Sequence, residues 1–124
     1  TQKGQGRHGY LINFYQLRPE SRGALHLASA DPYAHPVIDP RYLSAEGDRA
    51  VMRAGVRLAR AIGETAPLAA RKAADLSPVA ADLANDAAID AWIRRGANTI
   101  FHPVGTCAIG DVVDADPRMQ WVAG

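Results

Sequence analysis

The sequence predicts an α+β fold with a largely antiparallel sheet backed by helices. Two strand-like runs, residues 10–18 and 24–29, follow each other closely near the start of the chain, whereas two helical patterns come later. Strands in this order pair as a hairpin instead of alternating with crossover helices. No Gly-x-Gly-x-x-Gly motif opens a strand–helix–strand unit, so a dinucleotide-binding fold is not predicted from these residues.

The composition is that of an ordinary soluble domain. The chain has 124 residues, of which 48% are apolar and 22% are charged, and its formal net charge is +1. Because this charge is close to zero, it gives no electrostatic reason to expect binding to nucleic acid or to an anionic membrane. No apolar run is long enough to predict a membrane span. Cys107 stands alone and cannot form an intrachain disulfide, so we expect a reducing compartment, the cytoplasm.

The predicted strands follow a polar, glycine-rich start over residues 1–9, which is expected to be a loop. Residues 10–18 are rich in aromatic and branched side chains and carry apolar residues on both faces. Such a run is typical of a central strand that is covered on two sides. A turn over residues 19–23 leads to the second strand, residues 24–29, where His26 lies on the polar face.

A long helix is predicted after residues 31–40, whose prolines favour an extended, turning loop. Ser44 is the predicted N-cap, and Glu46 and Asp48 lie in the first turn, where the helix dipole favours carboxylates. Gly63 is the predicted stop. Apolar residues at helical spacing form a broad face: Val51, Met52, Gly55, Val56, Leu58, Ala59 and Ile62.

Four arginines form a second stripe on this helix: Arg49, Arg53, Arg57 and Arg60. A row of this kind could bind phosphate or RNA, or it could be a solvated outer face. Since the chain is almost neutral, we expect the solvated face.

A second helix is predicted to begin at Asn85 or Asp86 and to end at Gly96, after two arginines that complement its C-terminus. Its core-facing residues are Ile89, Trp92 and Ile93. Between the two helices, residues 65–85 are alanine-rich and broken by prolines, which predicts short helical turns joined by loops.

The stretch that best suits chemistry is residues 98–110, where a short β-branched run breaks at a Pro-Val-Gly turn. We expect a strand that ends at His102, with Ile100 on the same face. Histidine is the side chain whose ordinary pKa lies near neutrality, so His102 could be a structural residue or a general acid or base. A metal site is not expected, because no second ligand lies at suitable spacing. A nucleophile pair with Cys107 has no third group to orient it. The residues alone leave the role of His102 open.

The run His102-Pro103-Val104-Gly105-Thr106-Cys107-Ala108-Ile109-Gly110 resembles the His-Pro-x-Gly-Thr-Cys-x-Met-Gly motif of the glucose–methanol–choline (GMC) flavin oxidoreductases. The choline dehydrogenase-like branch is the most similar. Ile109 replaces the usual Met, which is an apolar exchange of similar volume. Residues 21–43 and 112–124 are similar to further stretches of the family, in the same order. The chain is therefore identified as a member of this family.

This resemblance implies that residues 1–124 are a C-terminal fragment of the substrate-binding domain, on the substrate side, without the flavin-binding domain. The parent would use FAD to oxidise the CH–OH group of a choline-like, aliphatic or aryl alcohol. Its partners would be that alcohol and the remainder of its own flavin domain. His102 would be the base that takes the hydroxyl proton, and Ile100 would line the substrate cavity. The residues implied to lie close to the flavin are Gly105, Thr106 and Cys107. Cys107 is expected to be a small buried packing residue.

A non-catalytic α+β interaction or assembly module is the alternative interpretation, in which the protein pairs through a free sheet edge. It accounts for the missing dinucleotide motif without a truncated chain. Because the sequence starts at Thr1 and stops at Gly124 in mid-pattern, we expect instead that the reading frame extends on both sides.

Overall fold

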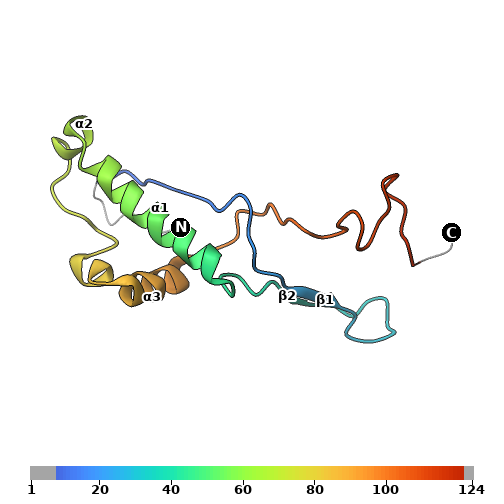
Figure 1. The fold of residues 1–124 in the computed structure, drawn as a ribbon. Helices are drawn as coiled ribbons and strands as arrows, with labels where there is room; N and C mark the ends of the chain where they lie inside the picture. Colours follow the sequence, from blue (N-terminus) through green and yellow to red (C-terminus); the bar gives the residue numbers. More distant parts are fainter. Residues whose placement is uncertain (1–7, 122–124) are drawn as a thin grey trace.

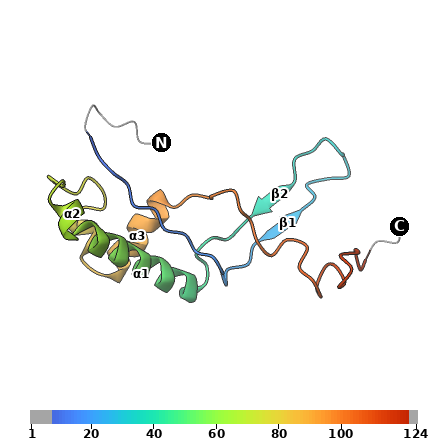
Figure 2. The same cartoon turned by 90° about the horizontal axis from the view of Figure 1, so that it is seen from above.

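A computed structural model describes residues 8–121 and confirms the α+β class in a reduced form, with three α-helices and one two-stranded antiparallel sheet. In chain order, the elements are β1 (Ala24–His26), β2 (Val37–Asp39), α1 (Glu46–Gly63), α2 (Ala66–Ala69), a 3₁₀ turn (Ala80–Leu83) and α3 (Asp86–Gly96). The helices gather at one end of the molecule (Figure 1). The β1–β2 hairpin and the C-terminal segment extend toward the other end, as the rotated view also shows (Figure 2). None of the helices within residues 8–121 is long and apolar enough to cross a membrane.

The predicted hairpin is wrong in its pairing, because β1 pairs with β2 and not with residues 10–18. The register sets Ala24 opposite Asp39 and His26 opposite Val37. A turn at residues 31–34 reverses the chain, since the backbone N–H of Ala34 donates to the carbonyl of Asp31 at 3.1 Å. Nearby, Gly23 lies so close to the backbone of residues 39 and 40 that a Cβ there would fall 2.2 Å from the Asp39 carbonyl oxygen. His26 is exposed, as expected.

Residues 10–18 are extended, but they have no strand partner in the described part of the chain. They run along α1, as Figures 1 and 2 show. The Phe14 ring lies against Gly55, and the Tyr10 hydroxyl donates to the Gly63 carbonyl at 3.5 Å. Exposure alternates along the segment: Ile12, Phe14 and Gln16 are half-buried, whereas Leu11, Tyr15 and Leu17 are exposed. The predicted strand is therefore covered on one face only, by a helix.

Helix α1 begins one residue later than predicted, with Ala45 and not Ser44 at the N-cap. Alanine has no side-chain acceptor, so no side chain of the helix caps its own first turn. The N-cap residue is instead hydrogen-bonded to a turn that is distant in sequence, because Ser21 Oγ accepts from the Ala45 N–H at 3.0 Å. Glu46 and Asp48 occupy the first turn, as expected.

The faces of α1 differ from those predicted. The buried residues are Asp48, Arg53, Val56 and Gly63, whereas Val51, Leu58 and Ile62 of the predicted apolar stripe are exposed. The solvated arginine face is confirmed only in part, because Arg57 and Arg60 are exposed, whereas Arg49 is half-buried and Arg53 is buried. All four bind carboxylates of α1, α3 or the connecting loop. Arg53 is only 8% exposed and donates to both oxygens of Asp90 on α3 at 3.0 Å. Ion pairs thus form much of the α1–α3 contact.

The core lies where α1 and α3 meet, and it is built from Val56, Ile89 and Ile93. Partly buried side chains surround this centre: Phe14, Leu43, Met52, Leu83 and Trp92. Helix α3 agrees with its prediction, since Asn85 Oδ1 accepts from the Ala88 N–H at 2.9 Å as the N-cap. The short turns expected within residues 65–85 are also present, as α2 and the 3₁₀ turn.

Residues 98–102 do not form the predicted strand. Asn98 Oδ1 accepts from the Thr99 N–H at 2.8 Å, and Thr99 Oγ1 accepts from the Phe101 N–H at 2.9 Å. These local side-chain bonds compete with a strand ladder, and Phe101 adopts a left-handed φ of 62°. Further on, isolated bridges join Val113 to Ile109 and to Met119. Residues 1–7 and 122–124, which include most of the predicted initial loop and the end of the family-like C-terminal stretch, lie outside the described residues.

Candidate functional site

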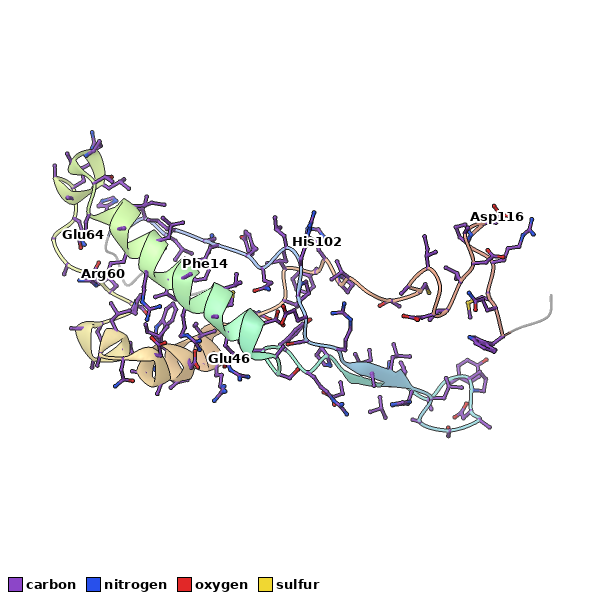
Figure 3. The ribbon with its side chains drawn as sticks, in the orientation of Figure 1. Phe14, Glu46, Arg60, Glu64, His102 and Asp116 are labelled. Atoms are coloured by element: carbon purple, nitrogen blue, oxygen red, sulfur yellow. The ribbon has the colours of Figure 1, made fainter. Side chains whose placement is uncertain are left out.

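An open groove of about 870 Å³ lies between the helical end, the base of the hairpin and the segment after α3. This volume is within the usual range for small-molecule sites. Its lining comes from residues 14–25, 38–43, 97–100 and 102–106, together with Asp48 and Met52 of α1 and Arg94 of α3. Figure 3 shows His102 where the segment after α3 passes the N-terminal segment.

His102 and Ile100 both line this groove. Both residues line the groove although the strand that was expected to align them does not form. Ile100 is 39% exposed, and His102 is exposed. Within the described residues, the imidazole makes no hydrogen bond to another side chain or to the backbone. Both of its nitrogens are therefore available to a small molecule in the groove.

The loop after His102 also borders the groove through Gly105 and Thr106. Gly105 has a φ of +88°, a conformation that glycine adopts without the strain of a side chain. Cys107 has a left-handed φ of 54° and does not line the groove. The expectation that Cys107 is a buried packing residue is wrong, since its thiol is free and exposed. It stands in a loop with little chain packed around it.

Arg22, in the turn before β1, lines the groove together with this loop. Its Nη1 donates to the carbonyls of Pro19 at 2.7 Å and Ser21 at 3.1 Å. Its Nε lies 4.0 Å from the position that a Cβ would take on Gly105. The two stretches with family resemblance, far apart in sequence, therefore meet at one side of the groove.

Asp48 of α1 is the most buried carboxylate near the groove, with 2% of the residue exposed. Its two oxygens accept from the backbone N–H groups of Glu20 and Ser21, both at 2.8 Å, and from Gln16 Nε2 at 3.0 Å. Burial alone would raise the pKa of Asp48, but hydrogen bonds from Ser21 and Glu20 and the charge of Arg22 bring this pKa below its ordinary value. Asp48 is thus an ionised anchor for the turn over residues 19–22.

The amide of Gln16 is buried beside the groove. Its Oε1 has no hydrogen-bond partner in the described part of the chain. Gln16 lines the groove, and its Nε2 donates to Asp48. Because Oε1 itself is buried, the surrounding side chains separate it from the open space of the groove.

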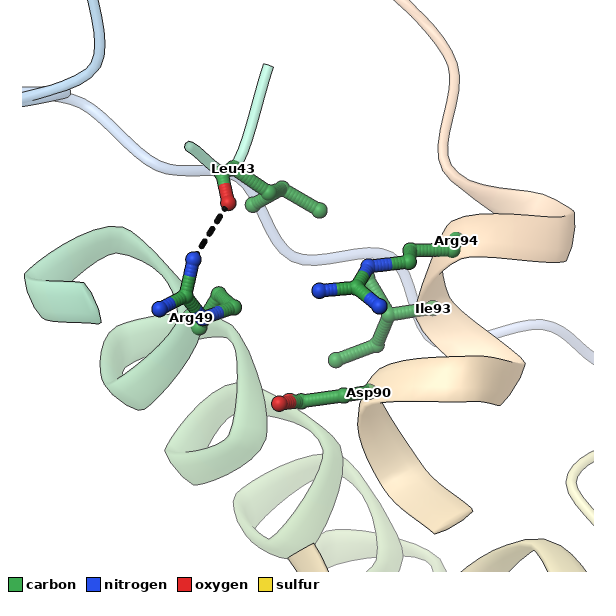
Figure 4. Close-up of a pocket in the computed structure, with 5 residues that line it drawn as sticks. All are labelled: Leu43, Arg49, Asp90, Ile93 and Arg94. Carbon is green, nitrogen blue, oxygen red and sulfur yellow. Dashed lines mark hydrogen bonds between the residues drawn. The ribbon is translucent and has the colours of Figure 1, made fainter. Parts of the chain in front are cut away.

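A second hollow between α1 and α3 is not a ligand site. It is lined by Leu43, Arg49, Asp90, Ile93 and Arg94 (Figure 4). Arg49 Nη1 donates across it to the Leu43 carbonyl at 2.9 Å. The space is too tight to admit a water molecule. Among residues 8–121, no group of three or more His, Cys, Asp or Glu side chains is arranged to hold a metal ion.

Sequence reasoning missed three residues of the groove: Gln16, Arg22 and Asp48. Arg22 belongs to a stretch that was noted for its family resemblance, but no role followed from its type. Asp48 was interpreted only as a first-turn carboxylate. The structural roles of these residues depend on contacts between segments far apart in the chain, and the spacing of residues within one segment does not reveal such contacts.

Comparison with known proteins gives a consistent result. The family model described as GMC oxidoreductase matches residues 19–124. A GMC-type oxidoreductase of Mycobacterium tuberculosis is 37% identical over 123 residues, which is 94% of this chain and 23% of that protein. An alcohol dehydrogenase [acceptor] of Pseudomonas putida is 42% identical over 103 residues, or 83% of this chain and 18% of that protein.

An oxygen-dependent choline dehydrogenase of Pseudomonas aeruginosa is 37% identical over an alignment of 126 positions, gaps included, that covers 98% of this chain and 22% of that protein. The chain thus spans about a fifth of the length of the curated relatives that it matches. No solved structure matches it.

Proposed function

This chain belongs to the GMC oxidoreductase family, and on that premise we propose that it is the substrate-side, C-terminal part of an FAD-dependent oxidoreductase acting on the CH–OH group of an alcohol. The observation that supports this function best is the shared groove. His102, Ile100, Gly105 and Thr106 line one hollow of a size that suits a small molecule. The parent, its substrate and its cofactor are all part of the proposal.

His102 is the proposed base. A neutral imidazole within hydrogen-bond reach of the alcohol hydroxyl accepts its proton, which makes loss of hydride from the carbinol carbon easier. FAD, when bound, supplies the acceptor for that hydride. The absence of any internal hydrogen bond to the His102 ring in the described chain supports this role, because the ring nitrogens are not already used. Ile100, beside it in the groove, provides apolar contact to the alcohol.

We propose that the loop after His102 lies beside the flavin ring. Gly105 has no side chain, so a ring can approach its backbone closely. The backbone N–H groups of residues 104–107 donate to no acceptor within the described chain and are free to bind one. We therefore propose Gly105, Thr106 and Cys107 as cofactor contacts, with Cys107 acting through its backbone. The residues that hold the rest of FAD would belong to the flavin domain.

The substrate is an alcohol of the choline-like, aliphatic or aryl kind. The two named relatives act on choline and on alcohols by their descriptions, and this chain is similar to both. Many large apolar side chains are exposed near the groove, among them Leu17, Phe101 and Val104. A surface of this kind is typical of one that a partner covers. We propose that the flavin domain of the same enzyme is that partner, and that the enzyme works in the cytoplasm.

The test is the rate of flavin reduction by alcohol in the full-length enzyme under anaerobic conditions. General-base assistance is worth on the order of 10²–10⁴ in rate, so His102→Gln should slow reduction by about that factor. His35→Gln is the matched control, because His35 is exposed in the hairpin loop and does not line the groove. Equal rates for both variants and the wild type, at equal flavin content, would contradict the proposal.

A further inference from the structure

The backbone has an unusual conformation at Phe101, one residue before His102. The φ angle of Phe101 is 62°, in the left-handed region, which a residue with a side chain adopts only under strain. Such a conformation persists only where the surrounding structure holds it. The ring of Phe101 contributes little support, since it is 80% exposed and does not line the groove. The support must therefore come through the backbone.

The hydroxyl of Thr99 supplies this support. Thr99 Oγ1 accepts a hydrogen bond from the Phe101 N–H at 2.9 Å, which closes a short turn over residues 99–101. Thr99 is half-buried and lines the groove. Its own N–H donates to Asn98 Oδ1 at 2.8 Å, so the residue that holds the turn is itself held. Two successive side chains thus shape the backbone that leads to His102.

The bond between Thr99 and Phe101 is the last hydrogen bond before the loop that follows His102. Within the described part of the chain, residues 102–107 make no hydrogen bonds to other residues. The next bonds involve the Ala108 carbonyl, which accepts from the N–H groups of residues 111–113. Because a rotation about the φ angle of Phe101 displaces the chain after it, the turn over residues 99–101 is the hydrogen-bonded feature that sets where His102 lies.

We propose that Thr99 is a positioning residue for His102. Its hydroxyl holds the N–H of Phe101, and the turn that results places His102 at the groove beside Ile100. The inference rests on the proposed function, in which His102 is the base. A base works only within hydrogen-bond reach, and a displacement of about 1 Å can cost on the order of 10² in rate.

The first readout is independent of catalysis. It is the NMR amide signal of Phe101 in the flavin-loaded, full-length enzyme with isotopically labelled phenylalanine, identified as the signal that Phe101→Leu removes. Thr99→Val keeps the shape of the side chain but lacks the hydroxyl, so it should shift this signal and speed its exchange with solvent. Thr99→Ser keeps the hydroxyl and should leave the signal close to its wild-type position.

Thr65→Val is the matched control. The Thr65 hydroxyl also bonds to a near neighbour, since it donates to the Ile62 carbonyl at 2.7 Å, but Thr65 follows the end of α1 and does not line the groove. This variant removes the same hydroxyl group from another turn. It should change neither the Phe101 amide signal nor the rate of flavin reduction.

The second readout is the limiting rate of flavin reduction at saturating alcohol. Thr99→Val should lower this rate by about tenfold or more. The rate should still depend on pH, because His102 is still the base, whereas His102→Gln should lose that dependence. Thr99→Ser should restore the rate to within about twofold of wild type, because serine forms the same kind of turn. Thr99→Ala, which also lacks the hydroxyl, decides the question if the valine variant does not fold.

A wild-type Phe101 signal and a wild-type rate in Thr99→Val would overturn the proposal, whatever His102→Gln does. A serine variant as slow as the valine variant would also overturn it, because the hydroxyl would then not be the cause. A Phe101 signal that moves in Thr99→Val and returns in Thr99→Ser, with an unaffected His102→Gln rate, would support the turn and contradict the base. The two failures are therefore distinguishable.

Discussion

In the helical half of the molecule, α1 and α3 enclose Val56, Ile89 and Ile93, whereas the loop half, made of the β1–β2 hairpin and residues 97–121, buries only Val113 among its described residues. The helical half is also joined by ion pairs across its centre, with Arg53 binding Asp90 and Glu46. The loop half is held mainly by the β1–β2 pairing and by local turns.

This contrast indicates that the helical half and the loop half have different roles. The helical half has its own small core and ion pairs inside the chain. The loop half carries His102 and leaves apolar side chains such as Phe101 and Val104 exposed. If the flavin domain covers this half, the site is completed only in the whole enzyme. Loops on a rigid support are a common location for catalytic residues.

Replacing one isoleucine by alanine in each half compares the two halves directly. The larger loss of stability is expected in the helical half. Ile93 is 3% exposed at the centre of the core. Ile93→Ala should lower the free energy of unfolding by about 2–5 kcal/mol, because it removes buried methyl groups and leaves a cavity. Urea unfolding of the chain, followed by the helical signal in circular dichroism, measures this loss. A loss below about 1 kcal/mol would show that the core is not where we place it.

Asp48 fixes the turn that precedes the hairpin to α1, so its effect should be intermediate and should depend on pH. The pKa of Asp48 in the folded state is below the ordinary value of 3.8, so its ionised form stabilises the fold. This contribution is complete above pH 3.8 and is lost as pH falls through the lower folded pKa. Asp48→Asn should therefore lower stability by about 2 kcal/mol near neutral pH, and the difference from wild type should shrink below pH 3.8.

Thermal unfolding of both proteins between pH 2.5 and 7 tests this expectation. The carboxylates of Asp39 and Glu46 also have lowered pKa values, through hydrogen bonds from Arg41 and from Arg53 and Arg49. They are present in both proteins, so they cancel in the difference. A difference in melting temperature that stays constant down to pH 2.5 would contradict the ionised anchor.

The smallest loss of stability is expected for Ile100→Ala in the loop half. Ile100 is 39% exposed and lines the groove, so its truncation should cost less than about 1 kcal/mol. In the full-length enzyme it should instead change the relative rates for large and small alcohols, because it removes apolar contact to the substrate. Unfolding curves and kcat/KM for a series of alcohols provide the two measurements. A large loss of stability with unchanged preference would identify Ile100 as a core residue.

The same contrast explains how much of the fold could be predicted. Helix α3 was predicted well, because Asn85 caps it and Ile89 and Ile93 repeat at helical spacing within one segment. The faces of α1 were not, because the carboxylates that take up its arginines include Asp86 and Asp90, far along the chain. Periodicity cannot detect a charge partner on another element.

The strand predicted over residues 24–29 was confirmed at Ala24–His26, whereas the other two strand predictions failed for related reasons. Residues 10–18 have strand-like composition, but their covering partner is α1, which composition does not identify. Residues 98–102 are β-branched, yet side-chain bonds from Asn98 and Thr99 turn the backbone. At the site, the shared location of Ile100 and His102 was predicted, whereas Arg22 and Asp48 were not, because their roles come from the assembled turn.

The pH dependence of flavin reduction tests the central claim most directly. In the full-length enzyme, the limiting rate for wild type should rise with pH, because only a neutral imidazole accepts the hydroxyl proton. The measurement is anaerobic stopped-flow reduction between pH 5 and 9, with flavin content checked in wild type and His102→Gln. The variant should reduce its flavin more slowly by a factor on the order of 10²–10⁴, and its limiting rate should no longer rise with pH. A variant that reduces its flavin at the wild-type rate, with the same pH dependence, would contradict the role of His102.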